Sequence, residues 1–190
     1  HNVAHSFPTR RSSDLLEDLQ GLKIRTIANP LYLEMLNALG ANAVPMPFPE
    51  LYGALETKAV DGQENPYATA EASKLYEVQK YFSATRHIYN PQMMLVGKKF
   101  WDQLSADEKK ILQDASNEAS AYQRKLAREM SEASRQNLIK QGMQINDLAP
   151  AEIARMRDKV KPVIDKFSAQ VGEPLVKEFY AELEKARAKK

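Results

Sequence analysis

The chain has 190 residues, of which 43% are hydrophobic and 27% charged, so it can form one ordinary domain or part of a two-lobed protein. Its 27 basic and 25 acidic residues give a net charge of +2, which gives no reason to expect a nucleic acid or an anionic membrane surface as a partner. The absence of cysteine excludes disulfides and thiol chemistry, and no apolar run reaches the roughly 18 residues that a membrane span needs.

The first fifteen residues, HNVAHSFPTRRSSDL, are polar and basic and have no hydrophobic period. They lack the apolar middle and small-residue cleavage site of a secretory signal. The segment SFPTRRSSDL resembles a translated sequencing-adapter remnant of the kind fused to truncated reading frames. We therefore predict that residues 1–15 are a non-native or disordered tail, outside the fold, and that a native export signal has been lost.

The next segments have local signals for a strand, a helix and an extended stretch. Residues 22–27 (LKIRTI) alternate apolar and polar side chains, which predicts a short strand. Residues 31–39 have apolar side chains at helical spacing, and Gly40 follows where a helix C-terminal glycine belongs. The prolines in residues 41–48 predict an extended edge or loop segment.

The middle of the chain reads as two helices separated by a loop. Residues 49–62 have an amphipathic pattern that predicts one helix, and residues 63–66 (QENP) predict a loop. The helical period resumes over residues 68–82. Residues 93–101 (MMLVGKKFW) have strand composition with a turn at Gly97.

The C-terminal half begins with the capping box SADE, in which Ser105 and Glu108 can satisfy each other's backbone N–H groups. A helix is predicted from there to Gly142, roughly 50 Å long, which is long enough to bridge two lobes. Its apolar residues predict one buried stripe: Ile111, Leu112, Ala115, Ala119, Tyr122, Leu126 and Met130. A strand at residues 143–148 and two helices, 150–172 and 174–190, complete an order of elements typical of an α/β fold.

The residues needed for catalysis or metal binding are largely missing. The three histidines are His1, His5 and His87, and the chain has no HExxH, CxxC, GxSxG or phosphate-binding glycine loop. Asp61 and Glu64 lie close in sequence, but two carboxylates alone are a weak acid/base signal. We therefore predict that the protein is not an enzyme and has no metal site and no cofactor.

Three side chains carry the remaining chemistry, and each has a structural and a ligand-binding interpretation. Arg25 lies inside an otherwise apolar strand, where it is either exposed, salt-bridged, or kept for a ligand carboxylate that its planar fork can bind. Asn65 precedes Pro66 and can serve turn chemistry or a ligand. Phe48 can belong to the core or form a pocket wall.

Three segments resemble the solute-binding proteins of TRAP transporters: GLKIRT, LGANAVPMPFPELYGALETKAVDGQENP and KLYEVQKYFSATRHIYNPQMMLV. The resemblance begins near Leu16 and covers essentially the rest of the chain. It implies a two-lobed periplasmic-binding-protein fold that closes on its ligand by hinge bending. The protein would then deliver the ligand to the TRAP membrane permease subunits, and a sodium gradient would drive the transport. The implied ligands are organic acids, including C4-dicarboxylates, sialic acid and sugar acids.

The resemblance also implies site residues. The family arginine that binds the ligand carboxylate falls on Arg25, and the asparagine of the QENP motif falls on Asn65. The aromatic pocket residue falls on Phe48, and a polar pocket position falls on Gln92. In this scheme the arginine selects for an acid, and the opposite lobe selects which acid.

The implied domain organisation is unequal. Residues 16–90 and 131–190 would build the second lobe, while residues 91–130 would supply a hinge strand and part of the long helix to the first. Most members are longer at the N-terminus, so we expect the first lobe to be largely missing here and residues 91–130 to expose an apolar patch. We therefore expect half of a ligand site, weak binding and a tendency to associate. The alternative function is a ligand-sensing periplasmic domain that signals to a membrane partner.

Overall fold

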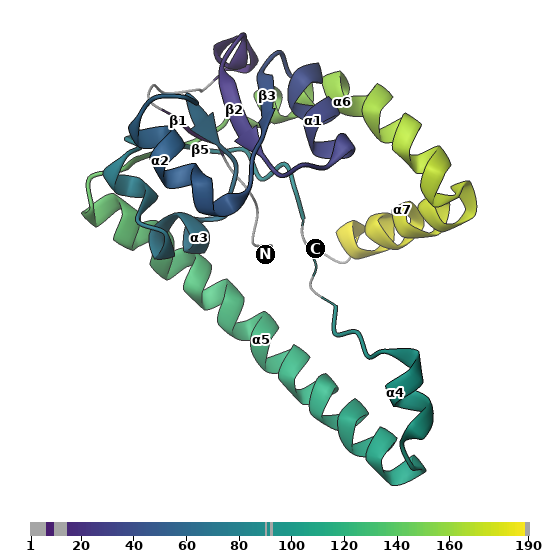
Figure 1. Cartoon of the computed structure of the whole chain (residues 1–190). Helices are drawn as coiled ribbons and strands as arrows, with labels where there is room; N and C mark the ends of the chain where they lie inside the picture. The colour runs from purple at the N-terminus through teal and green to yellow at the C-terminus, as the bar shows by residue number, and fades with distance from the viewer. Residues whose placement is uncertain (1–6, 10–14, 90, 92, 189–190) are drawn as a thin grey trace.

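The computed structural model describes residues 7–9, 15–89, 91 and 93–188, and within them one mixed sheet lies between two layers of helices (Figure 1). The strand order is β3-β2-β4-β1-β5-β6. Strand β2 is parallel to β3 and β4, and β5 is parallel to β6, whereas β1 is antiparallel to β4 and β5. The predicted α/β fold class is confirmed, and the strands are β1 (Phe7–Thr9), β2 (Lys23–Thr26), β3 (Asn42–Pro45), β4 (Gly62–Gln63), β5 (Tyr81–Ala84) and β6 (Gln144–Asp147).

Helices cover both faces of this sheet, and a helical arm projects away from it (Figure 1). The α-helices are α1 (Pro30–Ala38), α2 (Leu51–Glu56), α3 (Tyr67–Ala72), α4 (Lys98–Gln103), α5 (Ala106–Lys140), α6 (Pro150–Val171) and α7 (Glu173–Ala188). Three short 3-10 helices are η1 (Leu16–Leu19), η2 (Phe48–Glu50) and η3 (Leu75–Glu77). In the described part of the chain, no helix has both the length and the apolar character to cross a membrane.

The hydrophobic core has two parts, one on each face of the sheet. On one face, Ile24 of β2 is buried with residues of η1, α1 and α6. On the other, Phe82 of β5 is buried with residues of α2, α3 and the C-terminal end of α5. Both layers therefore fix the strands. The carboxyl ends of all strands except the antiparallel β1 lie along one edge of the sheet.

The unit β2-α1-β3 forms as its local signals predict. The side chain of Asn29 accepts a hydrogen bond from the Leu31 backbone N–H at 2.9 Å, and Pro30 occupies the first helical turn. The helix ends before Gly40, whose φ of +96° is a left-handed conformation. Pro45 lies in the edge strand β3, where a missing backbone donor is tolerated.

We expect Gly40→Ala to destabilise the fold by about 1–2 kcal/mol, because L side chains rarely adopt its backbone conformation. A Cβ there would also lie 2.7 Å from Gln20 Oε1, but that flexible side-chain end can move. The matched control is Gly53→Ala, inside α2 and with open space around it, which should stabilise by up to about 1 kcal/mol. Urea unfolding measures both, and shifts of equal sign would contradict the assignment.

The predicted helix over residues 49–62 is wrong beyond Glu56. Helix α2 has only six residues, and the chain then turns through Lys58, whose φ is +67°. Gly62 and Gln63 form β4, where a helix end and a loop were predicted. A two-residue strand has no detectable side-chain period, and it is held by backbone pairing to β2 and β1.

The predicted helix over residues 68–82 is also wrong after Ala72. The chain passes Lys74, at a φ of +52°, into η3 and then into strand β5. Leu75 and Phe82 are buried as the period requires, but they belong to different elements. Their spacing imitates one helical face because both side chains enter the same core.

Residues 7–9, which the sequence analysis left outside the fold, form β1 between β4 and β5. Its backbone pairs Phe7 with Ser83 and Thr9 with Tyr81. Strand pairing uses backbone groups, so a polar segment without hydrophobic period can still complete a sheet.

The long helix and its capping box are confirmed, since α5 has 35 residues. The Glu108 carboxylate accepts a hydrogen bond from the Ser105 backbone N–H at 2.7 Å, and Ser105 Oγ accepts one from the Glu108 backbone N–H at 3.3 Å.

The predicted strand at 93–101 is wrong, because residues 93–96 have no regular structure and α4 follows. The predicted buried stripe of α5 is also wrong before Ser134, since its large residues are exposed. These apolar segments project from the sheet and have no second layer to cover them (Figure 1). The predicted lobe boundaries remain predictions.

Candidate functional site

The candidate site lies where the parallel strands β3, β2 and β4 end. Arg25 is in register with Val44 of β3 and with Gln63 of β4. Loops that follow the carboxyl ends of parallel strands are where α/β sheets usually bind ligands. The geometry therefore brings the segments around Arg25, Phe48 and Asn65 to one edge.

Arg25 is a buried cation whose side chain is only partly satisfied by the protein. It is 2% exposed, and its Nε and Nη2 donate to the Met46 carbonyl oxygen at 2.9 and 2.6 Å. Its Nη1 group donates no hydrogen bond to any residue in the described ranges. Burial lowers the pKa of Arg25 and the nearby Glu64 carboxylate opposes this, but a guanidinium keeps its charge in proteins. The group is thus a fixed positive charge with donors left for an anion.

Phe48 lies beside this cation. The Arg25 Cζ atom is 5.6 Å from the centre of the Phe48 ring, within the range of a cation–π interaction. The ring is 42% exposed, so Phe48 does not belong to the core. Its position at the start of η2 follows from Pro47, which ends the extended segment after β3. The aromatic face therefore forms a side wall of the Arg25 position.

Asn65 follows β4 and is turned toward its last residue. Its Nδ2 donates to Gln63 Oε1 at 2.5 Å, and Gln63 is fully buried. Because Gln63 is in register with Arg25, Asn65 lies two residues beyond the strand partner of the arginine. The contact to Gln63 holds the Asn65 amide group at the same edge as Arg25.

Glu64 and Thr26 also belong to this site, and the sequence analysis did not select them. Thr26 Oγ1 donates to Glu64 Oε1 at 2.9 Å, and both side chains are buried. Burial raises the pKa of the neighbouring Tyr32, and the charge of Glu64 raises it further. The available signal was the position of Glu64 in the QENP segment, between Gln63 and Asn65.

Asp61 and Glu64, which lie close together in the sequence, lie at opposite ends of β4. Asp61 accepts a hydrogen bond from the Lys23 backbone N–H at 2.9 Å, at the amino end of β2. Glu64 lies at the opposite end with Thr26. The two groups therefore cannot act on one substrate atom as a general acid and base.

Gln92, the remaining predicted site residue, lies outside the described residues. Within those residues, no three His, Cys, Asp or Glu side chains are placed to hold a metal ion.

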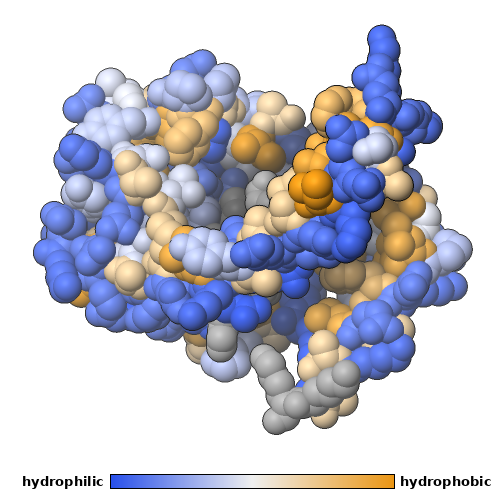
Figure 2. All heavy atoms as spheres, turned by 90° about the horizontal axis from the view of Figure 1, so that it is seen from below, coloured by the Kyte–Doolittle hydropathy of each residue, from blue (hydrophilic) through white to orange (hydrophobic). Residues whose placement is uncertain are grey.

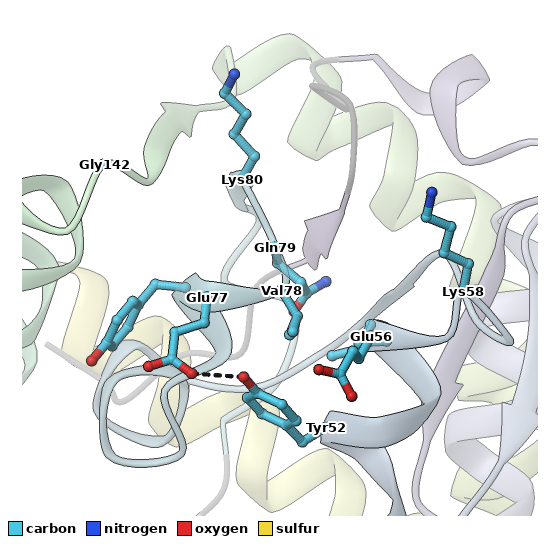
Figure 3. A pocket seen from close by; sticks show the side chains of 10 residues that line it. Tyr52, Glu56, Lys58, Glu77, Val78, Gln79, Lys80 and Gly142 are labelled. Carbon is cyan, nitrogen blue, oxygen red and sulfur yellow. Dashed lines mark hydrogen bonds between the residues drawn. The ribbon is translucent and has the colours of Figure 1, made fainter.

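A separate cavity of about 580 Å³ lies at the amino ends of the strands (Figure 3). Lys58, Lys80 and Gly142 lie just before β4, β5 and β6, and Tyr52 and Glu77 line the other side. Tyr52 Oη donates to Glu77 Oε2 at 2.6 Å, which raises the pKa of Tyr52 to about 12. Carboxylates line the wall of this cavity, and its rim is exposed. Unlike the Arg25 site, it has no buried cation among its lining residues.

Comparison with known proteins identifies the family. Residues 2–170 match the family described as bacterial extracellular solute-binding protein, family 7. The chain is 33% identical over 184 residues to the sialic acid-binding periplasmic protein SiaP of Vibrio cholerae, covering 95% of this chain and 56% of that protein. It is 30% identical to the C4-dicarboxylate-binding periplasmic protein DctP of Shewanella loihica, covering 93% and 53%. The chain thus spans about half the length of these curated relatives.

Solved structures agree with this match. A TRAP periplasmic solute-binding protein of Ochrobactrum anthropi, with its C-terminus bound in the ligand-binding pocket, has a TM-score of 0.91 and 49% identity, covering 98% of this chain and 59% of that one. The sugar acid-binding protein DctPAm of Advenella mimigardefordensis, in complex with galactonate, has a TM-score of 0.88 and 38% identity, covering 96% and 59%. From the sequence match and the shared fold, we conclude that this chain belongs to the TRAP transporter solute-binding proteins, family 7 of the bacterial extracellular solute-binding proteins.

Proposed function

We propose that this chain is the ligand-binding part of a TRAP-type solute-binding protein and that it binds the carboxylate of an organic acid through Arg25. The observation that carries the proposal is the buried guanidinium at the strand ends, whose Nη1 donors no residue in the described part of the chain uses. A carboxylate can accept two parallel hydrogen bonds from such a fork, which fixes its orientation as well as its charge. Phe48 covers one side of the cation and Asn65 lies at the same edge.

The class of acid follows from what relatives are known to bind. Relatives of this chain are described with sialic acid, C4-dicarboxylates, galacturonate, galactonate and glucuronate. All of these carry a carboxylate, and most of them also carry hydroxyl groups. We propose that this chain takes a ligand of this kind, with Arg25 and Asn65 at the carboxylate and Gln92 at a polar position of the pocket.

The role is binding and delivery, without chemical change of the ligand. We propose a periplasmic location and hand-over to TRAP membrane permease subunits, as the curated relatives are periplasmic binding proteins. The described residues support a non-catalytic site, because the only buried carboxylate beside Arg25 is engaged by Thr26. Binding needs no cofactor in this scheme.

The test is the thermal stability of the chain against a panel of acids: galactonate, glucuronate, succinate and sialic acid. We expect at least one acid at millimolar concentration to raise the unfolding temperature, because a ligand that binds only the folded state stabilises it. Galactose is the matched control for galactonate, since it lacks the carboxylate, and it should give no shift. Equal shifts with galactose, or no shift with any acid, would contradict the proposal.

A further inference from the structure

Two glutamine side chains, Gln63 and Gln79, are buried although each carries a polar amide group. On the face of the molecule that Figure 2 shows, hydrophilic residues cover wide areas, where water can satisfy their polar groups. Gln63 and Gln79 are instead 0% and 3% exposed. A buried amide that lacks hydrogen-bond partners is costly, so the protein itself must satisfy these groups. Their partners therefore indicate what the two residues do.

The two glutamines and Asn65 form one chain of side-chain hydrogen bonds, which we call the amide relay. Asn65 Nδ2 donates to Gln63 Oε1 at 2.5 Å, and Gln63 Nε2 donates to Gln79 Oε1 at 3.4 Å. The relay begins after β4, whose Gln63 is in register with Arg25. It ends before β5 at Gln79, which lines the cavity at the amino ends of the strands (Figure 3). The relay thus connects the ligand edge of the sheet to the opposite edge.

The relay has a direction, because the oxygen of an amide accepts hydrogen bonds and its nitrogen donates them. Gln79 Oε1 binds the nitrogen end of Gln63, which turns the oxygen end of Gln63 toward Asn65. That oxygen in turn requires the nitrogen end of Asn65. Gln79 is itself held by its backbone N–H, which donates to the Leu75 carbonyl oxygen at 2.9 Å. The orientation of the Asn65 amide is therefore set by Gln79, through Gln63.

This direction matters at the ligand edge, because a carboxylate accepts hydrogen bonds and cannot donate them. The Asn65 nitrogen carries two hydrogens, so it can donate to Gln63 and to a carboxylate oxygen at the same time. If the Asn65 amide were turned over, its oxygen would lie where the nitrogen now lies, and it would repel a carboxylate. The relay therefore favours an anion beside Arg25.

We propose that Gln63 and Gln79 are positioning residues of the ligand site, which hold the Asn65 amide with its nitrogen available to the ligand carboxylate. The inference rests on the proposed function, in which Arg25 and Asn65 lie at this carboxylate. Neither glutamine needs to contact the ligand, since both act through Asn65.

NMR of the isotope-labelled full chain tests the relay without any ligand. The Asn65 side-chain N–H signals, identified by their absence in Asn65→Asp, should exchange slowly with solvent, because one hydrogen is bonded to buried Gln63. Gln79→Met keeps a similar volume but removes the amide acceptor, so it should speed this exchange about fivefold, the effect of one ordinary hydrogen bond. Gln79→Glu keeps an acceptor and should stay within about twofold of the parent chain.

The control for these variants is Gln136→Met. Gln136 is exposed on α5, where it donates to Glu132 at 2.9 Å, and its loss should leave the Asn65 signals unchanged. Fast exchange in the parent chain, or equal exchange in the parent chain and Gln79→Met, would overturn the relay.

A double variant tests the direction. Gln63→Glu has an acceptor oxygen at each end, so it binds the Asn65 nitrogen whichever way it turns and no longer needs Gln79. Combined with Gln79→Met, it should restore slow exchange of the Asn65 N–H, whereas two glutamines that only fill space would give still faster exchange. This variant is judged on the amide signals alone, because a negative charge beside Arg25 would itself weaken carboxylate binding. Failure to restore slow exchange would contradict the direction.

Titration calorimetry connects the relay to the ligand. The probe is galactonate, or whichever of glucuronate, succinate and sialic acid stabilises the parent chain most. We expect Gln79→Met to lower the affinity about fivefold, and Gln79→Glu and Gln136→Met to stay within about twofold of the parent chain. Unchanged affinity in Gln79→Met despite faster amide exchange would overturn the inference while leaving the proposed function intact. If no acid binds the parent chain, the proposed function itself fails, and the relay has no ligand to serve.

Discussion

Replacing Arg25 by alanine should reduce the affinity for the stabilising organic acid about 30-fold or more. Removing one partner of a buried charge pair costs on the order of 2–5 kcal/mol, and every 1.4 kcal/mol is a factor of ten in affinity. In this chain the ligand carboxylate would also be left next to Glu64, which is then no longer opposed by the guanidinium. The measurement is the ligand-dependent shift in unfolding temperature, followed by titration calorimetry with the same acid.

Arg25→Lys should not restore binding. An ammonium group is a point charge and cannot offer two parallel donors to a carboxylate while also holding the Met46 carbonyl oxygen as Arg25 Nε and Nη2 do. Full recovery with lysine would show that charge alone is needed and would contradict the bidentate geometry.

The control for this series is Arg86→Ala. Arg86 follows β5 at the same edge of the sheet, but its side chain is exposed, and its ion pair with Asp147 is 3.5 Å long. Surface pairs of this kind contribute little. Arg86→Ala should therefore leave both stability and ligand response close to those of the parent chain. Since Arg25 is buried, the unfolding temperature without ligand must be recorded for each variant. Only the additional shift with ligand reports on carboxylate binding by Arg25. Loss of the shift in both variants would place the effect in the fold rather than in the site.

The elements that could be predicted from sequence are those with complete local signals. The strand around Ile24, helix α1 with Asn29 and Gly40 at its two ends, and helix α5 with its capping box all carry their own boundaries. Strands β1, β4 and β5 carry none. Each has two to four residues and exists because distant backbone segments pair with it, which no window of sequence reports.

The candidate site divides in the same way. Arg25 was identifiable because a cation inside an apolar strand needs an explanation, and Asn65 because it precedes a proline in a distinctive segment. Glu64 was not, because its burial depends on β2 and β4 meeting 38 residues apart, where Thr26 becomes its partner. The exposure of the α5 stripe could not be predicted from periodicity, since the same period describes a helix face that is covered and one that is not. Only the resemblance, which implies a largely missing first lobe, led to the expectation of an exposed apolar patch at residues 91–130.

The second layer of the core determines how well the Asn65 segment is held. Phe82 of β5 is fully buried, and its ring stacks on Tyr67 with the centres 4.5 Å apart. Tyr67 begins α3 only two residues after Asn65. The packing of one aromatic pair therefore connects β5 to the segment that carries a residue of the ligand site.

Phe82→Ala should lower the free energy of unfolding by about 3–5 kcal/mol, because it removes a buried aromatic side chain and leaves a cavity that the sheet cannot close. That is a large share of the 5–15 kcal/mol typical of a folded domain. Urea unfolding measures this loss. Phe179→Ala is the matched control, since this ring is 61% exposed on α7 and its loss should change stability by no more than about 0.5 kcal/mol.

Phe82→Ala also removes the stacking partner of Tyr67, so this variant should weaken the ligand response through Asn65. Equal losses in the two variants would mean that Phe82 does not anchor the core, and an unchanged ligand response would separate the aromatic pair from the site.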